Sequence, residues 1–84
     1  MHTMPFDIEF KPRAIKDLKA LPTETARRIM DKIGGLQNDL RGDVKRLTDH
    51  TPEYRLRVGD YRVLFEIERQ TVIVYRIVHR REAY

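Results

Sequence analysis

The second half of the chain consists of three stretches that each fit a β-strand, joined by very short connections. Apolar or aromatic residues alternate with charged ones through 54–58 and, with Leu64 as the exception, through 61–68, and residues 71 to about 80 follow as a last strand. This alternation has the period of a strand with one buried face. Gly59-Asp60 and Arg69-Gln70 are the only residues between the stretches, and such short turns join antiparallel neighbours. Three antiparallel strands therefore constrain the fold most.

The first half contains one further strand and two helices. Residues 6–10 alternate apolar and acidic side chains, which predicts a first strand. Apolar residues then recur at helical spacing from Pro12 to about Leu21, and again after Pro22 as far as Leu40. Gly34-Gly35 interrupts the second helix, because each glycine costs about 1 kcal/mol relative to alanine. We expect the helix to bend or end at this pair.

Residues 41–53 are polar, and we expect an irregular segment in which Val44 and Leu47 pack on the core. The complete order is β-α-α-β-β-β. It predicts an α+β fold, with a mainly antiparallel sheet and a helical hairpin packed on one face. A chain of 84 residues fits one domain, 1–84.

Several classes of site and location are excluded by composition. The chain has no cysteine, which removes disulfides and thiolate chemistry. His2, His50 and His79 lack metal-ligand spacing, so we expect neither a metal nor a cofactor. The start lacks the apolar core of a signal peptide, and the longest apolar run, 72–75, is too short to cross a bilayer. We expect a cytoplasmic protein without a membrane partner.

The basic residues change in kind along the chain. Net charge is +4, and all eight basic residues after Lys45 are arginine, whose planar fork suits phosphate. If the aromatic and aliphatic faces of the strands pack on the helices, with 73, 75 and 77 inward on the last strand, five arginines share the far face. They are Arg55, Arg57, Arg62, Arg76 and Arg80. This set favours a nucleic-acid phosphate as ligand, although a solvated face balanced by Asp60, Glu66 and Glu68 is the alternative.

The motifs in these strands resemble those of a known family. Residues 54–67, YRLRVGDYRVLFEI, are similar to the central motif of RelE-type toxins of the RelE/ParE superfamily of bacterial toxin–antitoxin systems. Residues 77–84, IVHRREAY, resemble the family's HR…Y ending, and 44–47 fits its lysine–leucine segment. The resemblance implies a RelE-like microbial RNase fold. It also implies a ribosome-dependent endoribonuclease, an mRNA interferase that cuts mRNA in the A site and inhibits translation.

The resemblance also implies roles for individual residues. The catalytic set would be Arg57, Arg62, Arg80 and Tyr84, and the RNA-binding set Lys45, Arg46, Arg55, Arg76 and Arg81. His79 is a further candidate acid or base, because imidazole exchanges protons near neutral pH. Family members often carry lysine where this chain has Arg55 and Arg57, and many continue into a helix beyond the position of Tyr84.

The expected partners are a cognate acidic antitoxin, the ribosome and mRNA, and operator DNA only through the antitoxin complex. Two other functions stay open. One is a ParE-like inhibitor of DNA gyrase without nuclease activity, and the other is an RNA-binding module without catalysis.

Overall fold

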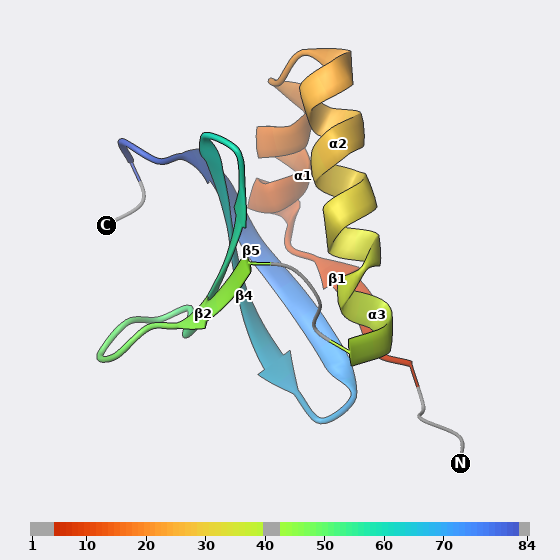
Figure 1. Ribbon diagram of the computed structural model, residues 1–84, viewed down its shortest axis with the longest axis vertical. Helices are drawn as coiled ribbons and strands as arrows, with labels where there is room; N and C mark the ends of the chain where they lie inside the picture. Colours follow the sequence, from red (N-terminus) through yellow and green to blue (C-terminus); the bar gives the residue numbers. More distant parts are fainter. Residues whose placement is uncertain (1–4, 40–42, 83–84) are drawn as a thin grey trace.

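A five-stranded sheet with helices on one face forms the protein (Figure 1). The computed structural model describes residues 5–39 and 43–82. The elements are β1 (Asp7–Phe10), α1 (Pro12–Lys19), α2 (Thr23–Gly34), α3 (Leu36–Asp39), β2 (Asp43–Arg46), β3 (Tyr54–Val58), β4 (Tyr61–Glu68) and β5 (Thr71–His79). The predicted α+β class and the helical pair on one face are confirmed.

The strand order is β1-β5-β4-β3-β2. Strands β2 to β5 pair antiparallel in sequence order, whereas β1 pairs parallel with β5. The last strand of the chain therefore lies between the first strand and β4. This order leaves β1 and β2 as the two edges and places β4 at the centre.

The core lies between the helices and one face of the sheet. Phe65 and Val63 of β4, Leu56 of β3, and Ile29 and Ile33 of α2 are at most 1% exposed. Burying each such side chain contributes about 1.5–3 kcal/mol. These contacts hold the strands against α2. The opposite face of the sheet carries polar side chains on β2 and β3, together with the buried Ile73 and Val78 of β5.

Two local boundaries follow the sequence. Pro12 is the first residue of α1, where its missing N–H costs no helical hydrogen bond. Helix α2 ends at Gly34 and Gly35 caps it, so the expected interruption at this pair is confirmed. None of the helices in the described part of the chain is long and apolar enough to span a membrane.

The structure differs from expectation in the segment 41–53, which was predicted to be irregular. Residues 43–46 form β2, paired along their length with β3. Only Val44 is apolar in this strand, so alternation carried almost no signal, and the strand exists because β3 offers an unpaired edge. Leu40, Arg41 and Gly42 lie outside the described residues.

A second difference is the face assigned to β5. Phe65 lies opposite Val74 and Leu64 opposite Arg76, so Tyr75 is an additional residue on β5, forming a bulge. A bulge shifts the alternation by one residue. Val72 and Val74 consequently join the core with Ile77, whereas 73, 75 and 77 were expected to face inward together.

Candidate nucleic-acid interface

Four basic side chains gather on the sheet face that the helices leave uncovered. Lys45 of β2 lies opposite Arg55 of β3, and Arg57 of β3 lies opposite Arg62 of β4. Their neighbours in sequence, such as Val44, point into the core, and alternation therefore turns the cations outward. We call Lys45, Arg55, Arg57 and Arg62 the basic face.

Arg57 and Arg62 carry like charges at directly opposite positions of two paired strands. Such a pair destabilises a sheet. The one acidic partner of Arg57 in the described part of the chain is Asp43, with 3.8 Å between Nη1 and Oδ2 and both side chains 55% exposed. An ion pair this open contributes little, so the repulsion is left largely uncompensated. An anion placed between the two guanidinium groups would relieve it.

Arg62 is held beside the turn that joins β3 and β4. Its Nη1 donates to the carbonyl oxygen of Gly59 at 2.9 Å and to that of Tyr61 at 3.0 Å. Gly59 has φ of +58°, a conformation that costs glycine little. The turn therefore fixes the position of the guanidinium group before any ligand arrives.

Arg55 is half-buried. Its Nε is buried and has no hydrogen-bond partner among the described residues. The neighbouring carboxylate of Glu66 is already engaged, because its Oε1 accepts the backbone N–H of Glu53. A buried donor without a partner costs about 1–3 kcal/mol, which again favours an external acceptor.

Arg80 follows β5 and borders the same turn. Its backbone N–H donates to the carbonyl oxygen of Asp60 at 2.8 Å, and its Nη1 lies 3.9 Å from Asp60 Oδ1. His79 instead lies opposite Tyr61 and packs its ring edge-on against that ring, with Nδ1 accepting the N–H of Arg81. Arg80 thus lies near Arg62, and His79 lies on the helix side of the sheet.

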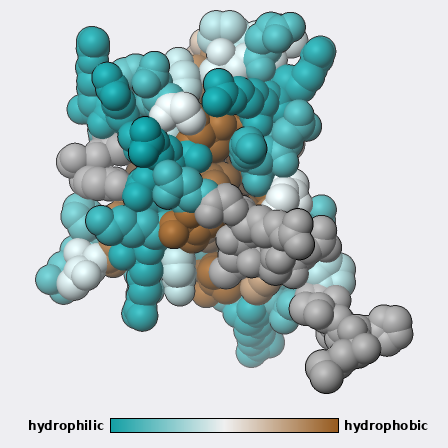
Figure 2. Space-filling view, in the orientation of Figure 1, coloured by the Kyte–Doolittle hydropathy of each residue, from teal (hydrophilic) through white to brown (hydrophobic). Residues whose placement is uncertain are grey.

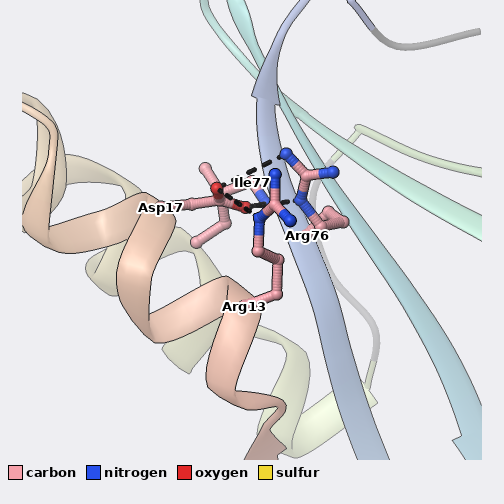
Figure 3. Close-up of polar contacts among 4 residues, drawn as sticks. All are labelled: Arg13, Asp17, Arg76 and Ile77. Carbon is pink, nitrogen blue, oxygen red and sulfur yellow. Dashed lines mark hydrogen bonds and ion pairs between the residues drawn. The ribbon is translucent and has the colours of Figure 1, made fainter.

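Arg76 lies opposite Leu64, which in turn lies opposite Arg55, so its position on the sheet is the expected one, but a carboxylate of α1 engages its side chain. Its Nε donates to Asp17 Oδ2 of α1 at 2.8 Å, and the N–H of Ile77 donates to the same oxygen at 2.9 Å (Figure 3). Pairing with β1 ends at Val74, so α1 supplies the acceptor that a neighbouring strand would otherwise provide. Arg13 lies 3.9 Å from the other Asp17 oxygen.

Two further predicted residues lie apart from the basic face. Arg46 follows Lys45 on β2, so alternation turns it to the other side, where it lies opposite Tyr54. Its Nε is 3.3 Å from Glu53 Oε2. Tyr84 lies outside the described residues. The described part of the chain holds no group of three His, Asp or Glu side chains suited to a metal.

Sequence reasoning missed Asp17. Its only local signal is the spacing of four residues from Arg13 on one helix face, whereas its main partner, Arg76, is 59 residues away. Contacts across that separation become visible only when α1 lies beside β5.

The family follows from sequence comparison. The profile of the "ParE toxin of type II toxin-antitoxin system, parDE" matches residues 8–84. The chain belongs to this toxin family. Toxin RelE3 of Methanocaldococcus jannaschii is 36% identical over 80 residues, which cover 89% of this chain and 91% of that protein. The superfamily predicted from the motifs is thereby confirmed.

Solved structures agree with this assignment. The RelB–RelE antitoxin–toxin complex from Methanococcus jannaschii contains a chain 34% identical to this one, with a TM-score of 0.75 over 90% of this chain and 94% of that one. The RelBE2 toxin–antitoxin complex from Mycobacterium tuberculosis gives 26% identity and a TM-score of 0.77, over 89% and 98% of the two chains.

Proposed function

We propose that this toxin is an endoribonuclease that cleaves mRNA in the ribosomal A site, with the basic face holding the phosphate that is cut. The observation that carries the proposal is the opposition of Arg57 and Arg62 on paired strands. Two fixed cations with little compensation form a binding position for a phosphoryl group. Relatives named RelE toxins support the choice of this activity within the family.

The proposed reaction needs no metal. The 2′-hydroxyl of the substrate loses its proton and attacks the adjacent phosphorus, and the bond to the 5′-oxygen breaks. The leaving 5′-oxygen takes up a proton from water, so the products are a 2′,3′-cyclic phosphate and a 5′-hydroxyl. Negative charge grows on the phosphoryl oxygens during attack, and Arg57, Arg62 and Arg80 would stabilise it. Arginine cannot act as a base in this setting. Because the site is built mainly from arginine, the ribosome would contribute by orienting the RNA.

A group other than arginine must accept the 2′-proton. Tyr84 is our candidate, by its resemblance to the family's C-terminal tyrosine. His79 is the weaker candidate, because Tyr61 and the N–H of Arg81 engage its ring on the helix side. Lys45, Arg55 and Arg81 would contact neighbouring phosphates. Arg46 and Arg76 would contact RNA only after their ion pairs with Glu53 and Asp17 are broken.

The test is primer extension on an mRNA in a reconstituted translation reaction. Wild-type protein should produce cuts at A-site codons only when ribosomes are present. Arg57→Gln should reduce the cleavage rate by about 100-fold or more, the effect expected when a donor to developing charge is removed. Arg69→Asn is the matched control, because it removes an arginine at the far end of β4 and asparagine tolerates the positive φ of 55° there.

Cleavage that persists unchanged in Arg57→Gln would refute the assigned site. Absence of cleavage by folded wild-type protein would refute the nuclease itself. The second candidate function is inhibition of DNA gyrase, because the matching family is described as ParE toxin. Accumulation of stalled gyrase–DNA complexes, with intact mRNA, would establish that alternative.

We also propose a cognate acidic antitoxin as the partner that silences the toxin. The similar structures from M. jannaschii and M. tuberculosis are antitoxin–toxin complexes. On this chain Ile15 of α1 and Met30 of α2 are each 42% exposed, which offers apolar contacts on the helix side of the protein. Failure of any small acidic protein encoded beside the toxin to co-purify with it would refute this partner.

A further inference from the structure

A second group of cations lies on the helix side, at the end of β3. A cleft of about 330 Å³ opens there between α2 and the β3–β4 turn, and its walls include Arg28, Lys32, Arg57, Asp43 and Gly59. Figure 2 shows this side of the molecule, with hydrophilic residues on both sides of a hydrophobic strip between the helices and the sheet. The cleft is separate from the face that holds Lys45 and Arg55, but Arg57 belongs to both.

The charges of the cleft are unbalanced. Three of its side chains are cationic, and the single acidic one, Asp43, pairs only loosely with Arg57 at 3.8 Å. Arg28 and Lys32 form no ion pair or hydrogen bond through their side chains with the rest of the described chain. They are four residues apart on α2 and therefore share one helix face. The cleft therefore keeps a net positive charge, which attracts an anion.

Arg28 lies beside the turn. A Cβ atom at Gly59 would lie 3.5 Å from Nη1 and 3.6 Å from Nη2 of Arg28, so the missing side chain at Gly59 leaves room for the guanidinium group. The side chain of Arg28 therefore reaches the end of β3, where Arg57 also lines the cleft.

We propose that Arg28 and Lys32, continuing from Arg57, bind the phosphate backbone of a second RNA segment, distinct from the strand on the basic face. The inference rests on the proposed function, since it extends the same RNA path over the end of β3 onto α2. An acidic peptide fits less well. The apolar residues of the cleft, Leu56 and Val58, are 0% and 4% exposed and offer little surface to anchor peptide side chains.

The test compares RNA binding by two variants of equal charge. Arg28→Gln/Lys32→Gln alters the cleft, and Arg27→Gln/Lys19→Gln removes two exposed cations outside it. The probes are an RNA hairpin and a trinucleotide, both 2′-O-methylated so that they cannot be cut. Affinities are measured across a range of salt concentrations, after thermal unfolding confirms that each variant folds.

The cleft variant should bind the hairpin more weakly, by roughly tenfold per lost contact near 0.1 M salt. The slope of log affinity against log salt concentration should become shallower by about 2. Trinucleotide affinity should hardly change, and the control variant should match wild type within about twofold for both probes. The single variant Lys32→Gln, which leaves Arg28 beside the turn, should show about half of the change in slope.

Hairpin binding by the cleft variant with the wild-type slope would overturn the inference. If Arg57→Gln still weakened binding in that case, the proposed function would stand without the second segment. Loss of poly-glutamate binding with unchanged hairpin binding would also overturn the inference and identify an acidic peptide as occupant. Failure of the wild-type protein to bind either RNA would overturn the inference, whereas the proposed function, which depends on the ribosome, would still be decided by primer extension.

Discussion

Arg76 and the pair Arg57–Arg62 show two different uses of arginine on one sheet. Arg76 is 34% exposed and bonds at 2.8 Å to Asp17, which is 14% exposed and also accepts a backbone N–H. Arg57 and Arg62 instead occupy directly opposite positions on two paired strands. The first arrangement satisfies a donor at a strand edge and holds α1 to β5. The second places like charges together at a cost to stability.

This difference distinguishes an arginine that has a structural partner from arginines that have little or none, which the spacing in the sequence does not. All three arginines lie in strands where apolar and charged residues alternate, and the sequence pattern does not distinguish them. Their partners distinguish them. Asp17 of α1 reaches β5 where its pairing with β1 has ended, whereas Arg57 has only the open pair with Asp43 and Arg62 has no carboxylate partner among the described residues. Stability should therefore depend on Arg76 and its partner, and activity on Arg57 and Arg62.

The largest expected effect on stability is at Asp17. Asp17→Ala leaves the Arg76 guanidinium and the Ile77 N–H without their acceptor, and should reduce the free energy of unfolding by about 2–3 kcal/mol. Urea denaturation of this variant, of Arg76→Ala and of the double variant would give the coupling energy. Asp17→Asn, which retains one acceptor oxygen, should lose less. A loss below about 0.5 kcal/mol, the usual range for surface substitutions, would show that this contact does not hold α1 to β5.

Gly59→Ala should have an intermediate effect. The added methyl group meets Arg28 at an ordinary contact distance of 3.5 Å, so the cost comes from the φ of +58°. We expect a loss of about 1–2 kcal/mol, measured by thermal unfolding. Gly59→Asn should recover part of it, because asparagine tolerates this conformation. Equal losses for alanine and asparagine would point to a steric cause instead.

The smallest expected effect is at Arg57, and its sign is the opposite. Arg57→Gln removes repulsion from Arg62 and should raise the free energy of unfolding by about 0.2–1 kcal/mol at low salt. The gain should shrink at high salt, because exposed charges are then screened. The same variant is expected to lose cleavage. A clear loss of stability would mean that the weak pair with Asp43 outweighs the repulsion and that the contrast with Arg76 is false.

Much of the fold was predictable because its signals are local. The bounds of β3 and β4 follow from alternation around Gly59-Asp60, which is complete in β3 and interrupted in β4 by Leu64, and α2 ends at the glycine pair. Strand β2 was missed because a four-residue edge strand with one apolar side chain has no pattern of its own. The same alternation that predicted the strands also predicted that Arg55, Arg57 and Arg62 point away from the helices.

Sequence by itself determined the family motifs, the α+β order and the outward cations of β3 and β4, because strand alternation and turn chemistry act between residues close in the chain. Only the tertiary structure decided that a bulge at Tyr75 shifts the faces of β5, that Asp17 bonds to Arg76, and that Arg28 lies beside the turn at Gly59. Each depends on packing between distant segments, and no local pattern records which side chain will be close enough to bond.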